Sequence, residues 1–217
     1  AMRVNEREVP WRAGLAISAL VKQAKPNADL AIVNGFPVPQ GQWAESLLDE
    51  GDEIVLIRKG EIPDASEMAA LLTARNTPGT ADKLRQACVG IAGVGGLGSH
   101  VALSLARAGV GKLVIADYDI VEPSNLNRQA YEAGQIGFLK AEAMAENLFA
   151  ANPSVDVDWR AARLEPGMIG SVFAGCQIVA ECLDLADQKA MLVESLRLQM
   201  PDAWVVAKHP QGKMCLA

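Results

Sequence analysis

One stretch decides the fold of the larger part of this chain: Cys88-Val89-Gly90-Ile91-Ala92-Gly93-Val94-Gly95-Gly96-Leu97-Gly98. Residues 89–92 are a mainly apolar run that predicts a buried strand, and the G-x-G-x-x-G pattern after it opens a predicted helix over 97–108. Glycines let the backbone turn sharply and approach phosphate groups closely, while a helix N-terminus offers unpaired N–H groups and a partial positive charge. The pattern therefore predicts a nucleotide site whose loop glycines contact phosphates: Gly93, Gly95, Gly96 and Gly98.

Strand and helix patterns alternate from this loop to the end of the chain. Such alternation is typical of parallel strands joined by right-handed crossovers. We therefore expect an α/β fold over 88–217, a Rossmann-like, mostly parallel sheet flanked by helices and short at its C-terminus. Further strands are predicted at 113–116, 155–159, 176–180 and 204–207, and further helices within 137–152 and over 186–200.

The first sixty residues follow a different pattern. Two short strands over 2–6 and 8–11 precede an amphipathic helix, and Asn34-Gly35 between apolar runs predicts a hairpin turn. A helical turn is expected at 43–48 and a buried strand at 54–57. The order β-β-α-β-β-β predicts a small ubiquitin-like β-grasp α+β domain over 2–60, followed by a helical linker over 61–87 with a helix at 66–73.

Composition excludes several classes of function. The net charge of −6, from 20 basic and 26 acidic side chains, argues against a nucleic-acid partner, which favours a basic surface. There is neither an apolar run of about 18 residues nor a secretory signal, so we expect a cytoplasmic protein without a membrane partner. The four cysteines form no C-x-x-C pair, so we expect free thiols and no zinc: Cys88, Cys176, Cys182 and Cys215.

A second polar block favours ATP over NAD as the nucleotide. Asp117, nineteen residues past Gly98, follows the second predicted strand, where a carboxylate accepts hydrogen bonds from ribose hydroxyls. Asn125, Arg128 and Gln129 come soon after it. A triphosphate needs such donors, since arginine binds phosphate oxygens bidentately and the amides add neutral N–H groups, whereas a dehydrogenase does not.

Lys140 and Asp184 complete the predicted site. Lys140 lies near a helix start and adds a point charge for the phosphates, and Asp184 follows a strand at the carboxyl edge of the sheet, where it suits Mg²⁺. Each polar residue also has a structural alternative. Asn125 can cap a turn, Arg128 can pair with surface acids, Lys140 can be a solvated helix residue and Asp184 can be a helix N-cap.

At these residues the chain resembles the ThiF/MoeB/ubiquitin-activating-enzyme superfamily, in the family's order across about 86–207. The resemblance is closest to the ThiF-like group of thiamine (thiazole) biosynthesis. It implies that ATP adenylates the C-terminal carboxylate of a ubiquitin-like sulfur-carrier protein, which a sulfur donor then attacks. It also implies a homodimer, with Arg75 reaching the partner's ATP. The implied site residues are Gly95 and Gly96 on phosphates, Asp117 on ribose, Asn125, Arg128, Gln129 and Lys140 on the triphosphate, and Asp184 on Mg²⁺.

Residues 2–60 resemble a ThiS-type carrier through Val4-Asn5, Asn34-Gly35 and the acidic turn at 49–52. A working carrier ends in Gly-Gly with a free carboxylate, whereas here the last strand continues into Arg58-Lys59-Gly60. Two alternatives to the adenylyltransferase stay open. One is a catalytically inactive or regulatory ATP-binding fusion, and the less favoured one is an NAD-dependent oxidoreductase.

Overall fold

The computed structural model of the 217-residue chain describes residues 1–64, 67–68, 79–208 and 214–216, and the side chains of all of these except 208 and 214–216. The chain divides into two compact units, Ala1–Pro78 and Gly79–Ala217. Within the described residues, no helix combines the length and the apolar character needed to cross a bilayer.

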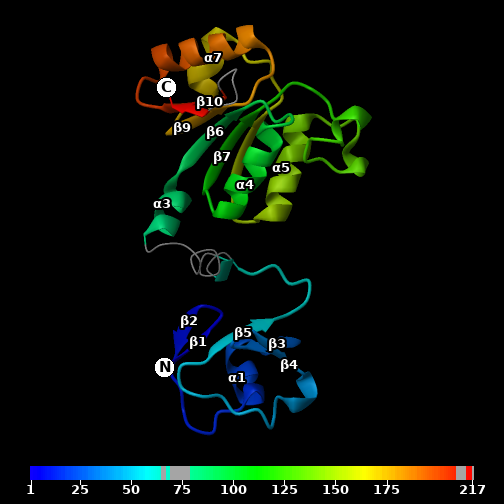
Figure 1. Ribbon diagram of the computed structural model, residues 1–217, viewed down its shortest axis with the longest axis vertical. Helices are drawn as coiled ribbons and strands as arrows, with labels where there is room; N and C mark the ends of the chain where they lie inside the picture. Colours follow the sequence, from blue (N-terminus) through cyan, green and yellow to red (C-terminus); the bar gives the residue numbers. More distant parts are fainter. Residues whose placement is uncertain (65–66, 69–78, 209–213, 217) are drawn as a thin grey trace. The chain divides into compact units, whose positions relative to one another are not determined.

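The first unit is the predicted β-grasp, with a five-stranded sheet in the order β2-β1-β5-β3-β4 (Figure 1). β1 and β5 are parallel and the other pairs are antiparallel. Asn34 (φ 49°) and Gly35 (φ 85°) form the expected hairpin turn. The helical turn expected at 43–48 begins earlier in the chain, as the 3₁₀ turn Gln40–Gln42. The elements are β1 (Met2–Val4), β2 (Arg7–Val9), α1 (Ile17–Ala24), β3 (Leu30–Val33), β4 (Phe36–Val38), the 3₁₀ turn Gln40–Gln42 and β5 (Glu53–Ile57).

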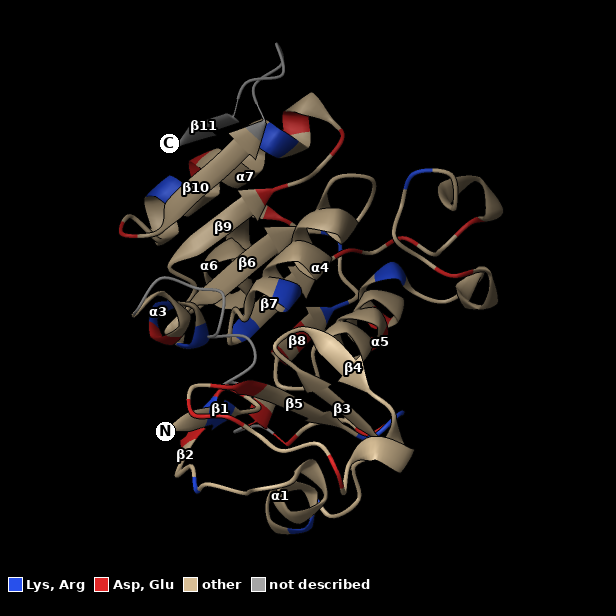
Figure 2. Ribbon diagram, turned by 60° about the horizontal axis from the view of Figure 1, so that its bottom comes forward, with Lys and Arg blue, Asp and Glu red and all other residues tan. Residues whose placement is uncertain are grey.

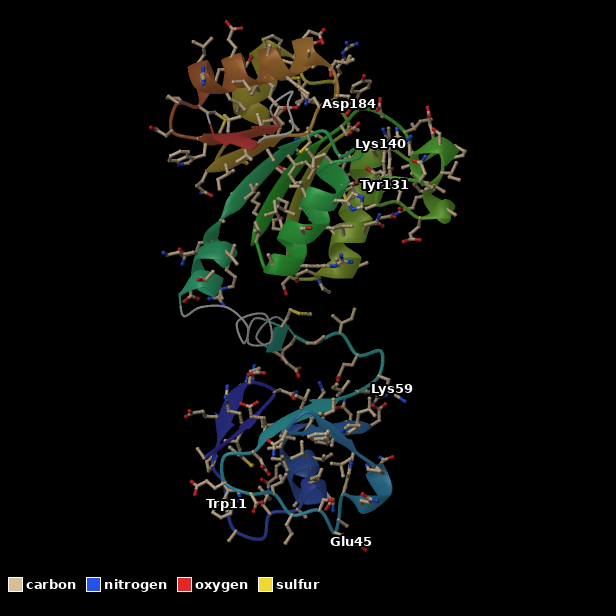
Figure 3. All side chains as sticks on the ribbon, viewed as in Figure 1. Trp11, Glu45, Lys59, Tyr131, Lys140 and Asp184 are labelled. Carbon is tan, nitrogen blue, oxygen red and sulfur yellow. The ribbon has the colours of Figure 1, made fainter. Side chains whose placement is uncertain are left out.

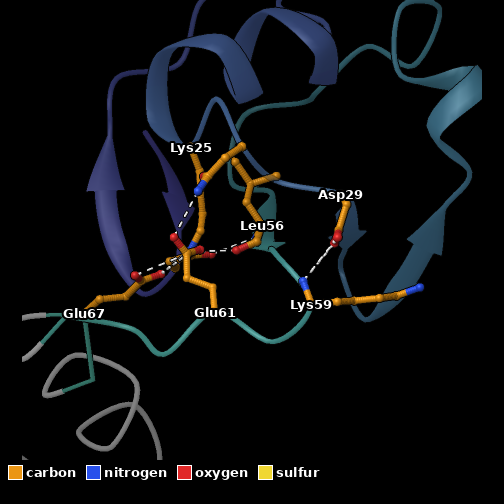
Figure 4. Close-up of polar contacts among 8 residues, drawn as sticks. Lys25, Asp29, Leu56, Lys59, Glu61 and Glu67 are labelled. Atoms are coloured by element: carbon orange, nitrogen blue, oxygen red, sulfur yellow. Dashed lines mark hydrogen bonds and ion pairs between the residues drawn. The ribbon is translucent and has the colours of Figure 1, made fainter.

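After β5 the chain is bound to its own unit by a polar cluster, which we call the Lys25 clasp and which consists of Asn5, Lys25, Glu61 and Glu67. Figure 4 shows Lys25 with Glu61 and Glu67. Lys25 Nζ lies 3.0 Å from Glu61 Oε2 and 3.2 Å from Glu67 Oε1. Asn5 Nδ2 donates to Glu67 Oε1 at 2.7 Å and to the Leu56 carbonyl at 3.0 Å. The segment that follows the last strand is therefore fixed to the body of the grasp.

The second unit holds a six-stranded sheet in the order β11-β10-β9-β6-β7-β8, parallel except for β11. This confirms the α/β prediction. β11 pairs antiparallel with β10 and was not predicted. The elements are α3 (Thr80–Gln86), β6 (Cys88–Ala92), α4 (Gly98–Ala108), β7 (Lys112–Ala116), 3₁₀ turns Pro123–Asn125 and Ala133–Gln135, α5 (Lys140–Ala151), β8 (Asp156–Arg160), the 3₁₀ turn Pro166–Met168, α6 (Ile169–Val172), β9 (Ile178–Glu181), α7 (Ala186–Gln199), β10 (Trp204–Lys208) and β11 (Met214–Leu216).

Two apolar clusters hold this sheet between helices. Ile91 and Leu113 point toward α4 and α5 on one face, and Ala92 and Val114 point toward α6 and α7 on the other. Alternate residues of each parallel strand are thus buried on opposite faces, which explains why β6 and β7 read as continuous apolar runs. Of the expected linker over 61–87, α3 belongs to the second unit, and the helix expected at 66–73 falls largely outside the described residues.

Candidate nucleotide-binding site

A cavity of about 230 Å³ lies at the carboxyl ends of β6, β7 and β9. β6 and β9 are neighbours in the sheet. From β6 the chain continues to β7 and β8 on one side, and from β9 it continues to β10 on the other, so the cavity lies where the strand order reverses. Open α/β sheets bind ligands at this switch point. The cavity is lined by Gly93, Gly95, Ala116, Asp117, Tyr118, Asp119, Lys140, Ala162, Arg163, Leu164, Cys182, Leu183, Asp184, Leu185, Gln188 and Met191.

The glycine loop connects β6 to α4 by a turn that only glycine fits. Gly93 has φ +86°, and its N–H donates to the Ala116 carbonyl at 2.8 Å. A Cβ on Gly98 would lie 1.8 Å from the Gly93 carbonyl oxygen. Gly95 and Gly96 have no such steric conflict, so their bare backbone leaves space for a ligand rather than for neighbouring protein atoms.

Asp117 follows β7 and is 9% exposed. Its Oδ2 accepts the Val94 N–H at 2.8 Å and its Oδ1 accepts the Asp119 N–H at 2.9 Å. Burial raises the pKa of Asp117, although these two hydrogen bonds and nearby Lys140 act in the opposite direction. Each carboxylate oxygen keeps a second lone pair, so the group is held in place and still able to accept from ribose hydroxyls.

Lys140 is the first residue of α5, and its side chain is 8% exposed. Its Nζ lies 3.0 Å from Asp119 Oδ2, within the cavity wall. The Tyr131 hydroxyl donates to the Val94 carbonyl at 2.7 Å, and the Lys140 carbonyl lies 3.3 Å from it. Figure 3 shows Tyr131, Lys140 and Asp184 at the same end of the sheet. Tyr131 therefore links the glycine loop to the start of α5. Lys140 lines the cavity, and its contact with phosphates stays a prediction.

Asn125 and Arg128 do not line the cavity. Asn125 is 6% exposed and its Oδ1 accepts the Glu122 N–H at 3.0 Å in a capping box, which is the structural alternative considered for it. Arg128 is exposed and donates from Nη1 to the Ser124 carbonyl at 3.1 Å and to Asn127 Oδ1 at 3.0 Å. Its stem passes within 3.9 Å of the Cβ position of Gly96. Contact of both residues with a triphosphate stays a prediction.

Gln129 is 8% exposed, and its Oε1 is buried with no hydrogen-bond partner among the described residues. Its Nε2 lies 3.9 Å from the Cβ position of Gly95. A buried polar group without a partner is costly and calls for a structural or functional explanation. Like Asn125 and Arg128, Gln129 does not line the cavity, and its contact with a triphosphate stays a prediction.

Asp184 lies in the turn after β9, is exposed and lines the cavity. Three carboxylates (Asp117, Asp119 and Asp184) and two cations (Lys140 and Arg163) face this space. Figure 2 shows acidic residues gathered where β9 ends. Among the described residues, no group of three or more His, Cys, Asp or Glu side chains could hold a metal ion by itself. The donor set fits a cation that arrives with phosphates, because Mg²⁺ uses one or two carboxylates and keeps water and phosphate ligands.

Among the cavity-wall residues that sequence reasoning did not assign to the site are Tyr118 and Arg163. The Arg163 guanidinium lies 5.7 Å from the centroid of the Tyr118 ring, a cation–π geometry. Tyr118 directly follows Asp117, and Arg163 follows β8 at the same edge of the sheet. Their position after neighbouring parallel strands was the available signal.

Arg75 lies outside the described residues, and the side chain of Cys215 is not described. Cys88, Cys176 and Cys182 are free and buried, as expected. The Sγ atoms of Cys88 and Cys176 lie 3.4 Å apart, and burial raises the pKa of Cys176. Burial, with Glu181 adding to it, raises the pKa of Cys182 to about 12.

Comparison with known proteins agrees with this geometry. "Adenylyltransferase and sulfurtransferase UBA4" of Yarrowia lipolytica is 42% identical over 101 residues, 46% of this chain and 26% of that protein. The protein of the same name from Candida glabrata is 35% identical over 158 residues, 71% of this chain and 35% of that protein. The chain thus spans about a third or less of the curated relatives it matches.

A solved structure of E. coli tRNA N6-threonylcarbamoyladenosine dehydratase, TcdA, in complex with ATP has a TM-score of 0.61 and 27% identity. The match covers 68% of this chain and 61% of that one. E. coli MccB with ATP has a TM-score of 0.53 and 26% identity, over 58% of this chain and 38% of that one. Residues 1–60 match the ThiS-like ubiquitin family. Because residues 69–201 match the ThiF family, the chain belongs to that family.

Proposed function

We propose that this chain uses ATP to adenylate the C-terminal carboxylate of a ubiquitin-like carrier protein. The single observation that carries the proposal is the set of groups that line the cavity: Gly93 and Gly95 of the phosphate loop, the buried acceptor Asp117 and the buried cation Lys140. The relatives named adenylyltransferases and the neighbours bound to ATP support it. Membership in the ThiF family favours ATP over NAD as the nucleotide.

The carboxylate oxygen of the carrier forms a bond to the α-phosphorus. The bond from that phosphorus to the bridging oxygen breaks, and pyrophosphate leaves with the electron pair. The chain itself forms no covalent bond in this step. Its residues hold the nucleotide, with Asp117 on the ribose, the N-terminus of α4 and Lys140 toward the phosphates, and Asp184 toward the metal. Positioning and charge stabilisation therefore supply the catalysis.

We propose that Mg²⁺ accompanies the ATP. A bound Mg²⁺ would neutralise phosphate charge and polarise the phosphoryl oxygens. The cavity supports this proposal because its two cations face three carboxylates, so the protein alone cannot balance a triphosphate. Asp184 is the carboxylate that makes no hydrogen bond or ion pair within the described part of the chain, and it is the residue we assign to the metal.

The acceptor is a separate carrier rather than the fused ThiS-like unit. The Lys25 clasp holds the chain after β5 against its own unit, and the sequence there lacks Gly-Gly. The relatives with both adenylyltransferase and sulfurtransferase in their names support a downstream sulfur transfer. Whether that transfer serves thiazole formation or another sulfur pathway, and whether the protein is a cytoplasmic homodimer, stay predictions.

ATP–pyrophosphate exchange with Mg²⁺ tests the proposal. The assay compares a carrier ending in Gly-Gly with the same carrier shortened by those two glycines. Asp117→Ala removes the ribose acceptor, and Asp156→Ala, an exposed acid at the start of β8, is its matched control. We expect exchange that needs the intact carrier, is lost in Asp117→Ala and is kept in Asp156→Ala. ATP binding without any exchange would leave a regulatory nucleotide-binding protein instead.

A further inference from the structure

An ion pair adjoins the turn that carries Asp184, and its carboxylate is buried while its lysine side chain is 30% exposed. Glu181 is the last residue of β9, and its side chain is 1% exposed. Lys189, on α7, places Nζ at 2.9 Å from Glu181 Oε1 and at 3.0 Å from Oε2. The Leu183 N–H donates to the same Oε1 at 2.7 Å. One carboxylate therefore joins the strand, the turn and the helix.

This turn packs against the phosphate loop. Glu181 is in register with Ala92, the last residue of β6, and the Cys182 N–H donates to the Ala92 carbonyl at 2.9 Å. A Cβ on Gly93 would come within 3.0 Å of the Cys182 carbonyl oxygen. The backbone at 182–183 is thus fixed against the glycine loop on one side and by Glu181 on the other.

Stability alone does not explain a charge pair in this position. Taking the Glu181 carboxylate out of water is unfavourable and offsets much of its attraction to the partly exposed Lys189, so apolar packing here often does as well. What the pair supplies is geometry: three hydrogen bonds from two elements converge on one carboxylate. Asp184, one residue after Leu183, is exposed and makes no hydrogen bond or ion pair with the described residues. Its direction depends on the backbone that carries it.

Resting on the proposed function, we infer that the Glu181–Lys189 pair is a positioning device for Asp184. It holds the 182–185 turn so that the Asp184 carboxylate faces the phosphate-bound metal. Neither residue contacts the nucleotide in this assignment, since neither lines the cavity. Supporting groups of this kind typically change metal affinity by about 10–100-fold when removed.

Calorimetric titration of ATP into the purified full chain, with Mg²⁺ and with EDTA, tests the inference. The readout is the ratio of the two dissociation constants within each variant, so a general loss of stability cancels. We expect the wild type to bind more tightly with Mg²⁺. Lys189→Met should reduce that Mg²⁺-dependent gain about tenfold. ATP binding in EDTA should change less than about twofold, because no nucleotide contact is removed.

Three further variants make the test specific. Lys189→Arg keeps the cation and should keep the gain, whereas Glu181→Gln removes the charge and should lose it. Lys112→Met, in an exposed ion pair at the start of β7, is the matched control and should behave as wild type. In Asp184→Ala, which already lacks the metal ligand, adding Lys189→Met should cause no further loss of the gain.

Several outcomes would overturn the inference. A Lys189→Met chain with the wild-type ratio would do so, as would independent, additive losses in the double variant. A wild type that binds ATP equally with Mg²⁺ and with EDTA would also do so. None of these titrations uses a carrier protein. A failed exchange assay would therefore contradict the proposed adenylation, while the role of the Glu181–Lys189 pair would still be decided by the titrations.

Discussion

Gly98→Ala should disrupt the second unit through one steric contact. The added Cβ would lie 1.8 Å from the Gly93 carbonyl oxygen, while ordinary contacts begin at 3.4 Å and contacts below 3.0 Å essentially do not occur. The two backbones must therefore separate by at least 1.2 Å, from 1.8 to 3.0 Å. Gly93 resists this movement, because its N–H is bonded to Ala116 and its Cα faces the Cys182 carbonyl.

The conflict is between backbone atoms, so no side-chain rotation relieves it. Overpacking usually costs about 1–3 kcal/mol, and we expect at least the upper part of that range. For a unit of this size, a loss of about 3 kcal/mol lowers Tm on the order of 10 °C. Differential scanning calorimetry of the full chain measures the shift, and calorimetric titration measures ATP binding, which we expect to be lost as the loop is displaced.

Gly134→Ala is the matched control, because a Cβ there meets nothing within 4 Å. Gly96→Ala separates folding from binding: its nearest neighbour is 3.9 Å away, so it should fold normally and weaken ATP binding by filling the approach to the phosphates. A Gly98→Ala chain with wild-type Tm and wild-type ATP affinity would refute the steric reasoning.

Three further predictions follow from the same site. Lys140→Met removes a buried cation, so it should weaken ATP binding about tenfold or more in a calorimetric titration. Because its partner Asp119 is half exposed, the Tm should change by only a few degrees. ATP affinity equal to that of the wild type would contradict the phosphate role. Asn125→Ala removes the capping box of its 3₁₀ turn and should lower the free energy of unfolding by about 1 kcal/mol in urea titrations, a change that a purely ligand-contacting Asn125 would not produce. With a pKa raised to about 12, Cys182 is a thiolate in only about one molecule in 10⁴ at pH 8. In the native protein Cys182 should therefore resist iodoacetamide, whereas in the urea-unfolded chain it should react, and mass spectrometry measures both.

The sequence predicted the parts of the site that depend on position along a strand. Asp117 and Asp184 were expected at one edge of the sheet because each follows a predicted parallel strand, and Lys140 was expected from its position near a helix start. All three line the cavity. The glycine loop was equally readable, since its turn needs glycine for local steric reasons.

The rest depended on contacts between side chains far apart in the chain. Arg163 and Tyr118 are 45 positions apart, and although they follow two neighbouring strands, no pattern in the sequence pairs their side chains. The Glu181–Lys189 pair connects a strand and a helix. In the sequence, a Glu and a Lys at these positions cannot be told from two ordinary solvated charges. The residue type of Asn125 suits both phosphate binding and turn capping, and only the structure shows that its side chain accepts the Glu122 N–H.

The Lys25 clasp determines which solution conditions keep the first unit closed on itself. Burial on its own lowers the pKa of Lys25, but the bonds to Glu61 and Glu67 outweigh it and the pKa is raised above 10.5. The bond from Lys25 also lowers the pKa of Glu61 below 4.5. Glu61 therefore contributes to the clasp until the pH falls through its lowered pKa, and Lys25 contributes until the pH rises through its raised one.

Between those limits both partners of the Lys25–Glu61 pair are charged. Its side chains are also only partly exposed, from 14% for Lys25 to 33% for Glu61, so added salt screens them less than it screens surface pairs such as Ala1–Glu50. Neither the pH nor the ionic strength of a cell thus acts as a trigger for this segment. Its attachment is a constant feature of the unit, and a substitution at Lys25 is the direct way to release it.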